Sequence, residues 1–121
     1  MRLFIPEIGT KLKLTQDWTF PLHFETRNKG AFEKLGIPFV GDKRRYGWFG
    51  DATQANPVSL PKETLLIVDR IYIRKGTTYD GGSLSQFSSL SFWCQCPGVK
   101  GKFRFWAKLP DVNRIECEVQ P

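Results

Sequence analysis

The chain has 121 residues, of which 40% are hydrophobic and 14% aromatic, so it fits one globular domain and is not an intrinsically disordered chain. Eighteen basic residues stand against twelve acidic ones, and the net charge is +6. This balance favours polyanions, acidic protein surfaces or anionic membranes as partners. An odd number of cysteines and no signal-like N-terminus argue against a secreted disulfide framework. No apolar run reaches the roughly 18 residues that span a membrane, so we expect a cytoplasmic protein with no membrane partner.

The first segment, residues 9–24, predicts two strands. Its lysines and leucines alternate over "KLKL", and its aromatic and aliphatic residues alternate with polar ones over "WTFPLHF". Pro21 lies inside the second run and has no N–H to donate to a strand ladder. It therefore predicts an edge strand or a kink there.

The second segment, residues 25–61, is mostly irregular and predicts one short helix. In "NKGAFEKLGIP", Asn28 suits the N-cap, Gly36 suits a left-handed residue at the end, and Pro38 blocks continuation. The stretch "GDKRRYGWFGDATQANP" follows and predicts a long loop. Long loops inside compact domains are often functional.

The third segment, residues 62–119, predicts four strands, in "ETLLIVDRIYIRKG", "SLSFWCQC", "FRFWAKL" and "RIECEV". Turn-rich stretches separate them, and "LPDVN" predicts a tight turn with one 3₁₀ turn before the last strand. Alternation assigns one set of side chains to the core: Leu90, Phe92, Cys94, Phe103, Phe105, Ala107, Ile115, Cys117 and Val119.

This order of strands and turns resembles the SH3-like small β-barrel. One domain over 1–121 is expected, with barrel strands in 9–24 and 62–119 and a long insertion at about 25–61 in place of the first loop. The chain has no ALYDY-like run, so polyproline recognition does not follow from the resemblance. An OB-like barrel is the alternative. The basic, aromatic composition also resembles that of small accessory proteins of phages and plasmids.

The alternate residues of the predicted sheet form a basic aromatic face. Exposing a tryptophan forgoes about 2 kcal/mol of burial, so either the insertion or a partner is expected to cover this face. Stacking of a base on an aromatic ring is worth about 1–3 kcal/mol, and Arg and Trp also dominate protein–protein hot spots. The face contains Arg70, Tyr72, Arg74, Trp93, Arg104, Trp106 and Lys108.

The loop "GDKRRYGWFGD" is a second basic aromatic set, with Lys43, Arg44, Arg45, Tyr46 and Trp48. In one interpretation its cations bind phosphates while an aromatic ring stacks on a base. In the other, Trp48 and the next residue, a phenylalanine, anchor the loop on the core and the cations stay solvated.

No catalytic or metal-binding pattern is evident. His23 is the single histidine, and no Ser/His/Asp or Cys/His arrangement or phosphate-binding glycine loop follows from the spacing. The cysteines lack the CxxC knuckles of structural zinc sites, so we expect Cys94 and Cys117 to be buried, reduced and metal-free.

The sequence thus predicts a non-enzymatic binding module with no cofactor and no small-molecule substrate. The expected partner is nucleic acid or a nucleoprotein complex, contacted through the basic aromatic face and loop. The alternative is a protein-interaction or inhibitory module of phage or mobile-element origin that binds a host protein.

Overall fold

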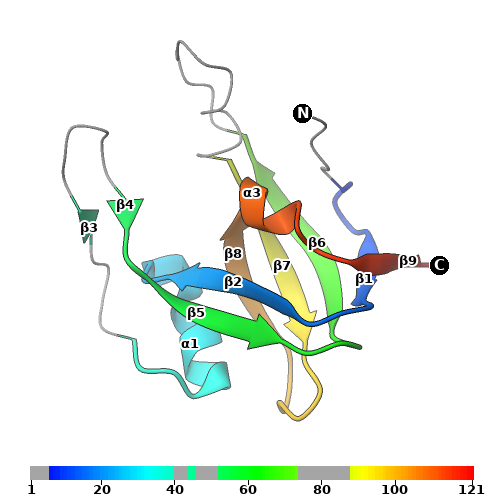
Figure 1. Cartoon of the computed structure of the whole chain (residues 1–121), viewed down its shortest axis with the longest axis horizontal. Coiled ribbons are helices and arrows are strands. Elements are labelled where there is room, and N and C mark those ends of the chain that lie inside the picture. The colour runs from blue at the N-terminus through cyan, green and yellow to red at the C-terminus, as the bar shows by residue number, and fades with distance from the viewer. Residues whose placement is uncertain (1–5, 40–43, 46–51, 74–87) are drawn as a thin grey trace.

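Two antiparallel sheets pack against each other in the computed structural model, which describes residues 6–39, 44–45, 52–73 and 88–121 (Figure 1). The larger sheet has five strands in the order β8-β7-β6-β1-β9, and the smaller pairs β2 with β5. A short pair, β3 (Arg44–Arg45) and β4 (Ala52–Thr53), lies apart from both. The prediction of a mostly β domain is confirmed, but the large sheet is open and does not close into a barrel.

The strands of the larger sheet are β1 (Lys11–Leu14), β6 (Leu65–Tyr72), β7 (Ser89–Gln95), β8 (Phe103–Lys108) and β9 (Cys117–Gln120). The smaller sheet is made of β2 (Trp18–His23) and β5 (Ala55–Leu60). The helices are the 3₁₀ helix η1 (Thr26–Asn28), α1 (Lys29–Leu35) and α3 (Leu109–Val112). The segment "LPDVN" is therefore a short α-helix followed by a turn. Among the described residues, none of the helices is long and apolar enough to cross a membrane.

One bent ribbon links the two sheets. Lys13 pairs with Leu65 in the large sheet and Trp18 pairs with Leu60 in the small one, with no change of register between them. At the corner, the N–H of Leu14 donates to the carbonyl of Thr64 (2.9 Å). The chain thus passes from one sheet to the other twice, and β5, which lies within the predicted insertion, forms half of the small sheet.

Pro21 lies on an edge strand, as predicted. It is directly opposite Pro57, and β2 and β5 pair only with each other among the described strands. The N–H of Phe24 donates to the carbonyl of Gln54 (2.8 Å), three positions from this pair. Because hydrogen-bonded and non-hydrogen-bonded pairs alternate along an antiparallel ladder, the two prolines share a non-hydrogen-bonded site, where neither needs an N–H.

Aromatic rings fill the space between the sheets. Trp18 stacks on Phe20 with 4.1 Å between ring centroids, and Phe20 stacks on Phe105 at 5.2 Å. The Trp18 indole N–H also donates to the carbonyl of Asp111 (3.1 Å), which ties α3 to this core. The inward alternation predicted for β7 and β8 is confirmed, since Leu90, Phe92, Cys94, Phe103, Phe105 and Ala107 are all buried.

The inward assignment was wrong for Val119 and holds only in part for Ile115 and Cys117, which pack against the core from its margin. Val119 is 66% exposed, while Ile115 and Cys117 are only half-buried. Strand β9 pairs with β1 alone and lies at the outer edge of the large sheet. No strand of the small sheet covers that edge (Figure 1), so alternation along β9 no longer separates core from solvent.

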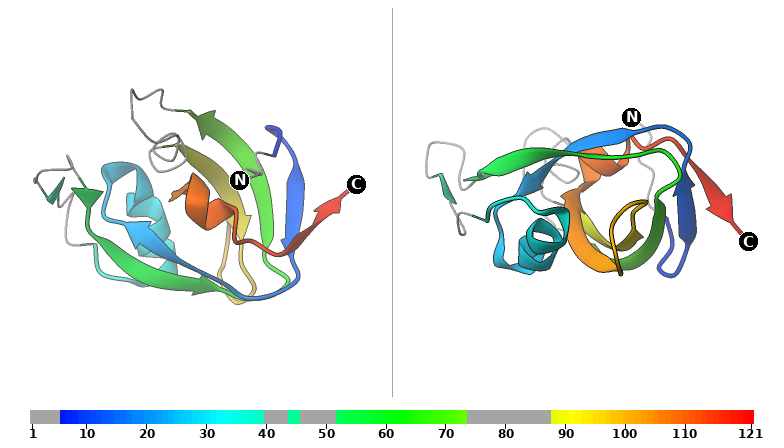
Figure 2. Two further views of the ribbon diagram at one scale, coloured as in Figure 1. Left: turned by 45° about the horizontal axis from the view of Figure 1, so that its top comes forward. Right: turned by 90° about the horizontal axis from the view of Figure 1, so that it is seen from below.

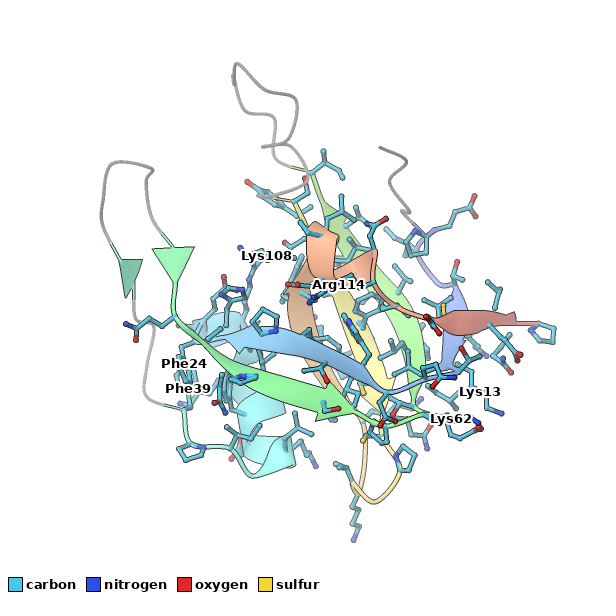
Figure 3. The ribbon with its side chains drawn as sticks, in the orientation of Figure 1. Lys13, Phe24, Phe39, Lys62, Lys108 and Arg114 are labelled. Atoms are coloured by element: carbon cyan, nitrogen blue, oxygen red, sulfur yellow. The ribbon has the colours of Figure 1, made fainter. Side chains whose placement is uncertain are left out.

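Helix α1 lies beside β8, at the other edge of the large sheet (Figure 2). Asn28 occupies its N-cap position and Gly36 ends it in the left-handed conformation (φ 70°), as predicted. The side chain of Asn28, however, makes no capping bond. Phe24 and Phe39 lie together (Figure 3), each in contact with the buried Phe32 of this helix at 5.0 and 5.4 Å between centroids.

Candidate functional site

The strand register brings six of the predicted residues to one face of the large sheet. Trp93 is directly opposite Arg104, Arg70 and Trp106 both lie opposite Ser91, and Tyr72 and Lys108 both lie opposite Ser89. The neighbouring residues Phe92 and Leu90 point into the core. This face, which we call the outer face, therefore points away from the small sheet. Arg74, the seventh predicted member, lies outside the described residues.

A β-bulge at Asp69 makes the outer face continuous. Val68 pairs with Phe92 and Arg70 with Ser91, so Asp69 is the extra residue on β6. Without it, strict alternation from the outward-facing Ile67 would turn Arg70 toward the core. The bulge also places the Asp69 carboxylate on this face, where it accepts a hydrogen bond from the Ser91 hydroxyl (3.0 Å) and pairs with Arg104 (3.5 Å).

Trp93 and Tyr72 are both exposed aromatic residues of the outer face, and Trp93 is the one that lines a groove. Trp93 is 39% exposed, and the guanidinium carbon of Arg104 lies 5.6 Å from the ring centroid. The groove has a volume of about 260 Å³. The groove is lined by Lys11, Leu65, Leu66, Ile67, Trp93, Gln95, Lys102 and Gln120.

Two of the residues that line this groove are lysines. Among the described residues, neither Lys11 nor Lys102 has an ion-pair partner. Lys11 lies opposite Ile67 on one side and opposite Gln120 on the other, while Lys102 immediately precedes β8. The groove thus combines an apolar floor, one indole wall and two cations.

Trp106 is in a different environment from Trp93. Its side chain is half-buried, and the guanidinium carbon of Arg27 lies 4.3 Å from its ring centroid. Glu25 holds this arrangement, because its carboxylate pairs with Arg27 (2.6 Å) and with Lys108 (3.9 Å). Burial opposes ionisation of Glu25, but the hydrogen bond from Arg27 and the nearby positive charges outweigh it and lower its pKa. The first residues of the insertion therefore cover Trp106 and leave Trp93 open.

The loop residues cannot be placed on this face. Lys43, Tyr46 and Trp48 lie outside the described residues. Arg44 and Arg45 form the backbone of β3, opposite Thr53 and Ala52. The predicted role of the loop in binding stays a prediction.

Sequence reasoning missed most of the groove. The alternation over "KLKL" predicts a strand that contains Lys11, but no local pattern indicates that β1 lies between β6 and β9. Lys102 belongs to the turn "PGVKGK" and enters the face only through the β7–β8 register. The missed lining residues on this face are Lys11, Leu65, Ile67, Gln95, Lys102 and Gln120.

None of the three cysteines is among the residues that line this groove. Cys94 is buried in the core, and burial, together with the neighbouring Cys96, raises its pKa well above the ordinary thiol range. Cys117 was expected to be buried as well but is half-buried on β9, where partial burial raises its pKa. Within the described ranges, no three His, Cys, Asp or Glu side chains cluster closely enough to hold a metal ion.

No protein-family model, curated protein or solved structure matches this chain. Function is therefore inferred from the residues of the outer face and from their geometry.

Proposed function

We propose that this protein is a non-enzymatic binding module that contacts nucleic acid, alone or within a nucleoprotein complex, through the outer face of its large sheet. The observation that carries the proposal is the exposed Trp93 ring next to Arg104, beside a groove lined by Lys11 and Lys102, which have no ion-pair partner among the described residues. Cations that bind phosphates and an aromatic ring that stacks on bases are the two elements of such sites. The net charge of +6 also attracts polyanions such as nucleic acids over longer distances.

The cations of the face differ in what they can offer a ligand. Arg104 is engaged with Asp69, and Lys108 with Glu25. A phosphate must compete with these carboxylates, whereas Lys11 and Lys102 have no such competitor among the described side chains. We therefore assign the main phosphate contacts to the two lysines.

We also infer that the fold is of the SH3-like type. The last strand pairs with the first, three strands follow the insertion in an antiparallel meander, and a short helix precedes the last strand. These features support the resemblance drawn from the sequence. Where a barrel would close, η1 and α1 lie along β8.

A protein partner is the second candidate. Leu65 is 38% exposed on the outer face, and with Ile67 and Trp93 it gives the groove an apolar floor that a partner's side chain could also cover. Binding dominated by such apolar contact would depend little on salt, because it releases no condensed counterions.

Affinity for oligonucleotides measured across a range of salt concentrations tests the proposal. The double variant Lys11→Ala/Lys102→Ala is expected to reduce the slope of log affinity against log salt by roughly two units. The matched control is Lys29→Ala/Lys62→Ala, which removes the same charge from two exposed lysines outside the groove. Binding that is independent of salt, or equal loss in both double variants, would contradict the proposal.

A further inference from the structure

We infer that the groove beside Trp93 accepts one unpaired nucleobase, stacked on the indole ring, so that the protein prefers single-stranded over duplex nucleic acid. This inference rests on the proposed function and names the ligand class of the same site. The observation behind it is the combination of an exposed ring, an apolar floor and flanking cations in one groove.

The shape of the site excludes a base inside a duplex. Trp93 lies on a sheet, with Ile67 and Arg104 as its neighbours across the strands, and it does not project from a helix or a loop tip. A base in a duplex is stacked on both of its faces, so an aromatic side chain reaches a face only when the base is single-stranded or extruded. Stacking on Trp93 therefore requires an unpaired base.

Polar groups lie where the edge and the backbone of such a nucleotide would be. Gln95 is two residues from Trp93 on the same face of β7, and its amide offers both donors and an acceptor to a base edge. Lys102 lies on the β8 side of the groove and Lys11 on the β1 side, two strand spacings or roughly 10 Å from Trp93. Cations on two sides of the ring suit the phosphates that precede and follow one nucleotide.

Charge favours this occupant over an apolar side chain of a protein. The described residues that line the groove include two lysines and no carboxylate. A hydrophobic side chain would leave both lysines without a counter-charge at the interface, whereas a nucleotide supplies a flat apolar face and an anion together.

The probe is a short single-stranded oligonucleotide, compared with a fully abasic chain that has the same number of phosphates and with a duplex of the same sequence. We expect the abasic chain to bind about tenfold more weakly to the wild-type protein. Trp93→Ala should remove this difference, while Trp93→Phe, which keeps an aromatic face, should retain most of it. The quenching of indole fluorescence by the oligonucleotide should be weaker in Trp93→Phe than in the wild type, because the other three tryptophans remain.

The outcomes separate this inference from the proposed function. Salt-dependent binding that is equally tight for the oligonucleotide and the abasic chain overturns base stacking but leaves nucleic-acid binding in place. Tighter binding of the duplex has the same meaning. Absence of salt-dependent binding to all three probes overturns both. If Trp93→Ala does not fold, the Trp93→Phe variant and the abasic comparison still decide the matter.

Discussion

The side chain of Asn28 pairs with the backbone of Trp106, 78 positions away in the sequence. Its Oδ1 accepts a hydrogen bond from the Trp106 N–H (2.7 Å), and its Nδ2 donates to the carbonyl of His23 (3.1 Å). Asn28 therefore hydrogen-bonds to the edge of β8, as the backbone of a neighbouring strand would, and links β8 to the end of β2. It also fixes η1 beside Trp106, so that Arg27 lies over the indole ring.

We predict that Asn28→Ala destabilises the protein by about 2 kcal/mol, because the buried amide partner of the Trp106 N–H is lost without replacement. Urea denaturation at neutral pH measures the change. Thr26→Ala is the matched control, since Thr26 is an exposed residue of the same short helix. Equal losses of unfolding free energy in the two variants would show that the hydrogen bonds of Asn28 do not stabilise the fold.

The two outer-face tryptophans should separate stability from binding. Trp106→Ala is expected to cost about 2–3 kcal/mol, because a half-buried ring in contact with Arg27 is deleted. Trp93→Ala should cost about 1 kcal/mol, since that ring is the more exposed one. Trp93→Ala should weaken the binding of single-stranded oligonucleotides more than Trp106→Ala does. Thermal melts and binding measured on the same two variants check both orders, and a larger loss of stability in Trp93→Ala would contradict the assignment.

The β7–β8 half of the face could be predicted because it depends only on local pattern. Alternation along each strand and a tight turn at "PGVKGK" were enough to place Trp93 beside Arg104, and the structure pairs these two residues directly. Uniform alternation along β6 also predicts Arg70 and Tyr72 on this face. Uniform alternation does not predict the bulge at Asp69, which lets Ile67 and Arg70 share one face.

The groove could not be predicted because its walls come from distant parts of the chain. Lys11 and Gln120 meet only after β1 has paired with both β6 and β9. In the same way, the residue type of Asn28 predicted a helix cap, while its side chain pairs with β8 instead. In each case a long-range partner decides the role of the side chain, and alternation or capping preference contains no information about that partner.

Glu25 should make stability depend on pH. Its carboxylate faces Arg27, Lys108 and His23, and these groups lower its pKa against the opposing effect of burial. A carboxyl group with a lowered folded-state pKa stabilises the fold fully above its ordinary pKa, and the contribution is lost as the pH falls through the lowered value.

We therefore predict that Glu25→Gln is less stable than the wild type by about 1.5 kcal/mol at neutral pH, and that this difference shrinks toward zero in acid. The measurement is the urea midpoint of both proteins across the acidic range. All other carboxyl groups titrate in both proteins, so their contribution cancels in the difference between the two stabilities. A difference that stays constant with pH would show that the ionised form of Glu25 is not what stabilises the fold.

The corner between the sheets places Glu63 in a conformation that suits glycine. Its φ is 81°, the only positive value at a non-glycine position in the described part of the chain. The turn around it is closed by the Lys62 N–H, which donates to the Asp17 carboxylate (2.8 Å), and by the Thr64 hydroxyl, which donates to the carbonyl of Pro61 (2.7 Å). These bonds hold the backbone in place while the Glu63 side chain reaches Lys13 (2.8 Å).

We predict that Glu63→Gly raises the melting temperature by about 4 °C, because glycine adopts positive φ without steric strain. The substitution also removes the ion pair with Lys13, but that pair is solvent-exposed and contributes little. Glu63→Ala is the control: it loses the same ion pair and keeps a Cβ atom, so it should melt no higher than the wild type. Equal melting temperatures for Glu63→Ala and Glu63→Gly would contradict the prediction, because they would show that the Cβ atom at this position causes no steric strain. The hydrogen bonds made by Asp17 and Thr64 would then be enough to explain the shape of the turn.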